Sequence, residues 1–122
     1  MKTLLTCTVV IASLLIPVNT IAQNVSTSAD RAFLRSFSSD LQANGVYLNV
    51  AAGGHYYIII AESMCALLNE EETTVQNQIN INERTGTDSP ETRIRLDAVL
   101  DNAIEYYCPN HREELIRLRN RR

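Results

Sequence analysis

Two cysteines, Cys65 and Cys108, constrain the fold of this chain more than any other feature. They are the cysteines that remain once an N-terminal export segment is removed, and 43 positions separate them. An even cysteine count in a small exported domain predicts a disulfide, and two cysteines allow one intramolecular pairing. A redox-active or metal-binding pair is the alternative, but there is no Cys-x-x-Cys motif and no histidine in a ligand pattern nearby. We therefore predict a structural disulfide, which loop-closure arithmetic values at roughly 4 kcal/mol.

The N-terminal segment has the order of a secretory signal peptide. Met1-Lys2 is a short positive start, residues 3–18 are almost wholly apolar, and Thr20-Ile21-Ala22 places small residues at the cleavage-recognition positions. The apolar run of about 13 residues is shorter than the ~20 residues that span a bilayer. We expect cleavage after Ala22, no transmembrane span in the mature chain, and an extracytoplasmic location, secreted or in the cell envelope. A retained membrane anchor is the alternative.

Composition describes a globular domain, with 45 % hydrophobic and 20 % charged residues. The net charge is −3, and it becomes −4 without the signal segment, because Lys2 is the one charged residue within 1–22. This acidic balance argues against general nucleic-acid binding. A length of 122 residues excludes a large α/β barrel or a two-domain dinucleotide enzyme.

Helical periodicity is the main pattern of residues 30–111. A first helix is predicted after a cap at Ser28 or Asp30, with Asn44-Gly45 as its stop signal. A loop over 46–54 follows, in which Ala51-Ala52-Gly53-Gly54 is predicted as a flexible hinge. A second helix is predicted from about His55 to Asn69, with the apolar stripe Tyr57, Ile60, Ala61, Met64 and Leu68. The β-branched run 58–60 also fits a strand, but the length of the segment favours a helix.

Two further helices are predicted in the second half of the chain. Thr73-x-x-Gln76 is a capping box before a third, weaker helix with only two apolar anchors, Val75 and Ile79. Ser89-Pro90-Glu91 combines a capping serine, a proline at the first helical position and an acid in the first turn, which predicts the start of the last helix. Its apolar stripe is Leu96, Leu100, Ala103 and Tyr107, widened by Val99 and Ile104.

These elements predict an all-α fold, a small bundle of three or four short helices stapled by one disulfide. The expected organisation is a signal peptide over 1–22, a flexible leader over 23–29, the helical domain over 30–111 and a basic tail over 112–122. Residues 109–122 carry five arginines against two glutamates, whereas 23–108 carry five arginines against twelve acidic residues. The tail is a solvated helix end, or it makes weak contact with an anionic surface, an acidic partner or the protein's own body.

Motifs around the cysteines resemble a known family. The last predicted helix ends in Ala103-Ile104-x-x-Tyr107-Cys108-Pro109, and upstream stand Asp30-x-x-Phe33-Leu34, Asn44-Gly45-Val46 and Ile58-x-x-Ala61-x-x-Met64-Cys65-x-x-Leu68. Together, over roughly residues 30–111, they resemble the domain of unknown function 732 family, small exported proteins common in mycobacteria and their relatives. The resemblance implies an exported helical domain with one disulfide, and it implies no catalytic residues.

Haem or iron binding is one chemistry that the residues allow. His55, Tyr56 and Tyr57 are adjacent, His111 lies near the far end of the predicted disulfide, and exported haem carriers use tyrosine and histidine as iron ligands. A structural role explains the same residues, because Tyr57 fits the core stripe and Tyr56 a half-exposed surface. We therefore assign no cofactor and no metal site.

Acid and nucleophile chemistry finds less support. Asp97, Asp101 and Glu105 share one helix face at i, i+4 and i+8, and three acids suit a hard cation. No loop typical of Mg²⁺ or Ca²⁺ sites accompanies them, and Arg93 can pair with Asp97 one turn away, so a solvated face is expected. Ser63 lies within a helical segment without a Gly-x-Ser-x-Gly motif, so we predict no catalytic residue.

The sequence thus predicts an exported helical domain that is a non-enzymatic binding or envelope-associated module. Its partner would be a protein, a lipid or another envelope component rather than nucleic acid. The alternative function is a carrier of a small apolar ligand such as a lipid or haem, and a small hydrolase is the third hypothesis.

Overall fold

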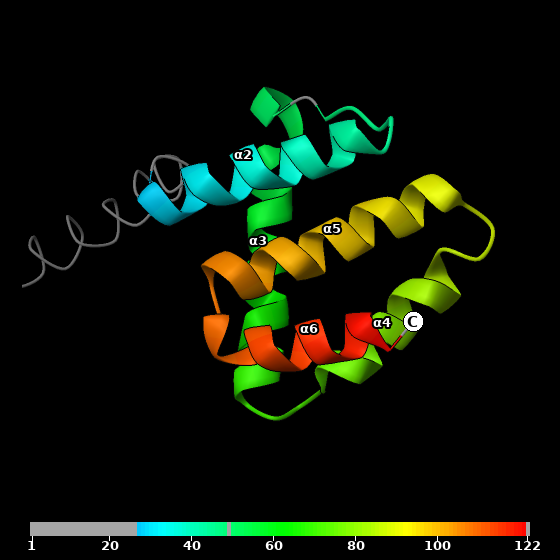
Figure 1. The fold of residues 1–122 in the computed structure, drawn as a ribbon. Helices are drawn as coiled ribbons and strands as arrows, with labels where there is room; N and C mark the ends of the chain where they lie inside the picture. The colour runs from blue at the N-terminus through cyan, green and yellow to red at the C-terminus, as the bar shows by residue number, and fades with distance from the viewer. Residues whose placement is uncertain (1–26, 49, 122) are drawn as a thin grey trace, which may run out of the picture.

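The computed structural model describes residues 27–48 and 50–121. The predicted signal peptide and residues 23–26 of the predicted leader lie outside these residues. Within them the order of elements is α2 (Ser28–Ala43), α3 (Val50–Asn69), α4 (Val75–Thr85), α5 (Pro90–Tyr106), the short 3-10 helix η2 (Pro109–His111) and α6 (Arg112–Asn120) (Figure 1). The all-α prediction is confirmed, and the helix beyond the expected three or four is the C-terminal segment.

The core lies where α2, α3 and α5 meet, and α4 and α6 close its lower end (Figure 1). α3 crosses α2 and α5 at a steep angle, and both pack against one side of it. The largest side chains that are fully buried are Phe33, Phe37, Leu41, Ile58, Ile79, Leu100 and Ile104. Burial of this kind, rather than local helix propensity, supplies most of the stability of short helices.

Helix starts follow capping side chains, two of them one position from the prediction. α2 is capped by Thr27, whose Oγ1 accepts a hydrogen bond from the amide of Asp30 at 3.1 Å. Ser28 is already helical, so the predicted cap and the last residues of the predicted leader are wrong. α4 is capped by Thr74 rather than by Thr73. In both cases neighbouring hydroxyl residues compete, and the one with extended backbone becomes the cap.

The start of α5 matches the prediction. Ser89 has extended backbone and its Oγ accepts from the amide of Thr92 at 3.3 Å, and Pro90 occupies the first helical position. The predicted stripe is shifted, since Leu96 and Tyr107 are half-buried while Ala98 joins the core. The capping serine and the proline act within four residues of the helix start, so the sequence alone is sufficient to predict that start.

α3 begins at Val50, earlier than predicted, so the predicted hinge at Ala51–Gly54 is wrong and these residues are helical. Gly54 is buried. A glycine in a helix costs about 1 kcal/mol relative to alanine, and the helix continues through Gly53 and Gly54 despite this cost. Residues 58–60 are helical, which rules out the strand alternative. The buried stripe is Ile58, Ala61, Cys65 and Leu68, with Tyr57, Ile60 and Met64 half-buried beside it.

The C-terminal segment is a packed element of the bundle. α6 contacts α4 and α5, and Leu115 and Leu118 are buried, whereas Ile116 is exposed. Of the possibilities that the sequence allowed for the basic tail, contact with the protein's own body is the one found. The helical domain therefore extends through α6 rather than ending at His111.

The predicted disulfide is present. Cys65 of α3 and Cys108, just after α5, are bonded, with their Cα atoms 5.7 Å apart and both residues buried. The bond joins the second helix of the bundle to the end of the long α5, as the sequence predicted. Buried, bonded cysteines have no thiolate to offer as nucleophile or ligand.

Candidate functional site

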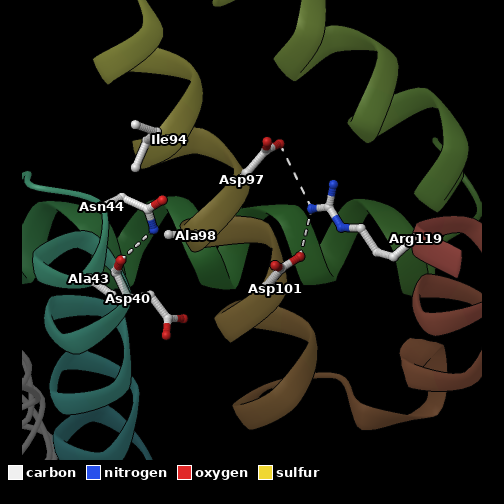
Figure 2. Close-up of a pocket in the computed structure, with 8 residues that line it drawn as sticks. All are labelled: Asp40, Ala43, Asn44, Ile94, Asp97, Ala98, Asp101 and Arg119. Atoms are coloured by element: carbon white, nitrogen blue, oxygen red, sulfur yellow. Dashed lines mark hydrogen bonds and ion pairs between the residues drawn. The ribbon is translucent and has the colours of Figure 1, made fainter. Parts of the chain in front are cut away.

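A groove of about 420 Å³ opens between α2, α5 and α6. Asp40 from α2 and Arg119 from α6 line opposite sides of it, with Asp97 and Asp101 of α5 between them (Figure 2). It contains two of the three carboxylates that the sequence placed on one face of α5. Its full lining is Asp40, Ala43, Asn44, Ile94, Asp97, Ala98, Asp101 and Arg119.

Arg119 links the carboxylates of α5 to α6. Its Nη2 lies 2.7 Å from Asp101 Oδ1 and 3.8 Å from Asp97 Oδ1 (Figure 2). Arg93 approaches the other oxygen of Asp97 at 3.7 Å, the i, i+4 pair that the sequence predicted. On the far side, Asp40 Oδ2 accepts from Asn102 Nδ2 at 2.8 Å.

The face of α5 predicted to be solvated is therefore in part an interhelical contact. Asp97 and Asp101 meet Arg119, and Glu105 accepts two hydrogen bonds from Arg112 at 2.8 and 3.0 Å. The prediction missed this because the arginines stand on a segment that the sequence assigned to a tail. Among the described residues, no group of three His, Cys, Asp or Glu side chains is placed to hold a metal ion. The polar side chains of the groove hold the helices against one another, and they already have partners within the chain.

Burial raises the pKa of Asp101, and the negative charges of Asp97 and Asp40 add to this shift, while the hydrogen bond and charge of Arg119 oppose it. The folded protein thus holds this proton more tightly than the unfolded chain does. For an acid with a raised pKa, the folded state loses stability as the pH rises from the unfolded pKa through the folded one. Arg119 limits that loss.

We expect Arg119→Met to lower the free energy of unfolding near neutral pH by about 1 kcal/mol, because it leaves the partly exposed carboxylates of Asp97 and Asp101 without their shared cation. Asp101→Asn should be milder, since its amide oxygen still accepts from Arg119 and one desolvated charge is gone. The stability of Asp101→Asn relative to wild type should increase as the pH rises above the unfolded aspartate pKa of about 3.9, because the raised pKa of Asp101 costs the wild type stability there. Urea unfolding at several pH values measures both, and a larger loss for Asp101→Asn than for Arg119→Met would contradict this account.

A second polar contact is buried beside the disulfide. The hydroxyl of Tyr107 donates to Asp30 Oδ1 at 2.5 Å, across 77 positions of sequence, and Asp30 is 3 % exposed. Burial raises the pKa of Tyr107, and the hydrogen bond to Asp30 raises it further, so the phenol remains a donor. The ring of Tyr107 also packs against Phe33 at 5.4 Å. This pair joins α2 to the end of α5, whereas from the sequence we considered Asp30 as a cap and as part of the family motif, not as a partner of Tyr107.

Of the candidate haem ligands, the rings of Tyr56 and Tyr57 lie 5.3 Å apart, edge to face, but their hydroxyls have different surroundings and His111 lies elsewhere. Tyr57 turns toward the core, where its ring lies 4.8 Å from that of Phe37 and its hydroxyl accepts from Arg95 at 3.2 Å. Tyr56 points outward and is 63 % exposed. His111 contacts Asn69 at 2.9 Å, at the far end of α3, roughly 21 Å along the helix axis from His55.

The opposite side of α3 exposes apolar side chains, and no other helix of the described part of the chain packs over them. Tyr56, Ile59 and Leu67 are 63, 49 and 42 % exposed, and they lie with Ser63 and Ala66 on one face at helical spacing. We call these five residues the outer face of α3. α3 thus has apolar side chains on two sides, one packed against α2 and α5 and the other exposed.

We did not predict the outer face from the sequence, because we assigned a single apolar stripe to this segment and did not look for a second one. The signal that could have found it is the second stripe at spacings 3, 4 and 4 from Tyr56 through Leu67. Ser63, considered as a nucleophile, lies in the middle of this face and is exposed. Among the described residues, no helix has the length and apolar character that crossing a membrane requires.

Comparisons with family models, with curated proteins and with solved structures found no match to this chain. The groove and the outer face of α3 are therefore interpreted from their own contacts, exposure and charge.

Proposed function

We propose that this protein is an exported, disulfide-closed helical domain that binds a partner through the outer face of α3 and catalyses no reaction. The observation that carries this proposal is the exposure of Tyr56, Ile59 and Leu67 in one row on a helix whose other side is core. Soluble monomers rarely expose contiguous apolar patches without a binding role. Tyrosine at such a site supplies a large contact area with a polar tip.

Export is supported by the disulfide and by the N-terminal sequence. Bonds such as Cys65–Cys108 persist in oxidising compartments and are rare in the cytosol. Residues 1–22 have the order of a signal peptide. We also propose membership of the exported family that the Tyr107-Cys108-Pro109 ending and the earlier Cys65 resemble.

The rigidity of the scaffold supports a binding role. α3 is held from behind by the disulfide at Cys65 and by the contacts of Tyr57 with Phe37 and Arg95. A face presented on a fixed helix loses little conformational entropy when a partner covers it. The groove, by contrast, is occupied by contacts between α2, α5 and α6.

A single experiment tests export and binding together. The full chain, with a photoreactive benzophenone residue at Ile59, is expressed, and protein from the medium and the envelope is illuminated. We expect the unmodified fraction to have the mass of residues 23–122 less two hydrogens, and the illuminated fraction to contain a covalent adduct. The matched control carries the same group at Arg35, which is exposed on α2, and should give no adduct.

Each part has an outcome that contradicts it. Retention of the full 122-residue chain in the cell with reduced thiols would contradict the proposal that the protein is exported. Equal labelling from Ile59 and Arg35, or none from Ile59, would contradict the proposal that the outer face of α3 binds a partner. A small molecule that stays with the protein under native conditions, without cross-linking, would favour the carrier alternative instead.

A further inference from the structure

We propose that the partner of the outer face of α3 is a second copy of this chain, packed antiparallel about a two-fold axis at Ser63. The inference rests on the proposed function and names the partner of that same surface. An isologous contact of this kind requires the face to be complementary to itself, with each residue before the axis matched to one equally far beyond it.

The apolar residues of the face satisfy this requirement. Ile59 and Leu67 stand four residues before and four after Ser63, so each would meet the other residue type on the second copy. Symmetry makes this contact twice. Ser63 at the axis and Ala66 beside it are small, which allows two helices to approach closely.

The polar ends of the face match in the same register. Tyr56 and Glu70 each lie seven residues from Ser63, at opposite ends, and both are exposed. In the antiparallel pair the phenol of Tyr56 faces the carboxylate of Glu70 on the second copy, a donor opposite an acceptor. A parallel pair would place Glu70 against Glu70, and it would also align the two helix dipoles unfavourably.

Charge favours a second copy over a lipid surface. α3 contains no lysine or arginine, Glu62 is exposed on its flank, and Glu70-Glu71-Glu72 follows its end. Helices that lie on membranes carry basic residues beside the apolar face, because the lipid headgroups are anionic. This surface would be repelled by them.

The size of the face sets the expected strength. Tyr56 to Leu67 spans about 16 Å of helix, or about three turns. The area that so short a face can bury is small beside the ~800 Å² that each partner buries in a stable complex. We therefore expect a reversible dimer with a dissociation constant on the order of micromolar or weaker.

The test is sedimentation equilibrium of the purified, disulfide-bonded mature protein from about 1 µM to about 1 mM. Ile59→Arg and Leu67→Glu, each alone, should weaken self-association at least about tenfold, which corresponds to 1.4 kcal/mol. The matched control is Ile116→Arg, at an apolar residue that is 51 % exposed on α6, and it should dimerise as wild type does.

A mixture of the Ile59→Arg and Leu67→Glu proteins tests the register. In the antiparallel pair, the arginine of one variant faces the glutamate of the other, and the remaining Leu67–Ile59 contact is intact. The mixture should therefore associate at protein concentrations at which neither variant associates alone. Circular dichroism of each variant confirms that it is folded. No rescue in the mixture would overturn the antiparallel register.

Two further outcomes separate this inference from the proposed function. A wild-type protein that stays monomeric throughout the concentration range overturns the second copy as partner. If Ile59 nevertheless cross-links to another protein in the cell, the face is still a binding surface and only its occupant changes. If Ile59 gives no specific adduct either, both proposals fail.

Discussion

Replacing Cys65 and Cys108 together by alanine is expected to lower the free energy of unfolding by about 4 kcal/mol. The estimate follows from the 43-residue separation of the two cysteines, since the bond removes loop-closure entropy from the unfolded chain. A domain of this size has about 5–15 kcal/mol in total, so the variant would keep its fold with a much smaller margin. The melting temperature should fall by roughly 15–30 °C.

The position of the bond explains why its loss cannot be compensated locally. It joins α3 to the end of α5, one residue after Tyr107, whose hydroxyl holds Asp30 of α2. Without the bond, this end is held by side-chain packing, by that hydrogen bond and by the contacts of Asn69 with Asn110 and His111. Fraying should therefore begin at the junction of α5 and η2.

Thermal unfolding by circular dichroism, with and without reductant, measures the effect. Reduced wild type should melt close to the double-alanine variant, and reductant should leave the variant unchanged. A wild-type melting temperature that is the same with and without reductant, when mass analysis shows two free thiols, would show that the bond contributes no stability.

Phe37→Ala is expected to cost about 3–5 kcal/mol, the second large effect. Phe37 is 0 % exposed, and its ring stacks on Phe33 at 5.6 Å and packs at 4.8 Å against Tyr57. It therefore fills the space between α2 and α3, where no exposed side chain can collapse into the cavity. The same substitution would loosen α3 behind its outer face.

Urea unfolding of the intact, disulfide-bonded protein checks this value. Phe37→Leu should cost less, because it leaves a smaller cavity. Ser39→Ala, at an exposed position of α2, should change stability by no more than about 0.5 kcal/mol. A loss below about 1 kcal/mol for Phe37→Ala would mean that this junction is not the centre of the core.

The helix starts that depend on interactions between neighbouring residues were predicted best from the sequence. The start of α5 was correct because Ser89, Pro90 and Glu91 act within one turn of backbone. The caps of α2 and α4 were one residue off because adjacent hydroxyl residues satisfy the same local rule. The start of α3 was missed because Gly53 and Gly54 argue for a break locally, whereas the helix runs through both of them.

The candidate surfaces show the same division. Tyr56 and Ser63 were noticed for chemistry, as a haem ligand and a nucleophile, yet their structural place is the outer face of α3 together with Ile59 and Leu67. The acidic face of α5 was seen as solvated, because nothing in its own segment shows that Arg119 covers it. A periodic pattern states that a side is apolar or charged, but it does not state what lies against that side.

By itself, the sequence determined the helical class of the fold and the pairing of Cys65 with Cys108. Periodicity is a property of the local chain, and with Cys7 assigned to the predicted signal peptide the other two cysteines allow one intramolecular bond. Only the tertiary structure decided that Tyr107 binds Asp30, that α6 returns to pair Arg119 with Asp101, and that Tyr56, Ile59 and Leu67 of α3 are exposed. These contacts join residues far apart in the chain, and they depend on how the helices cross, which no local pattern encodes.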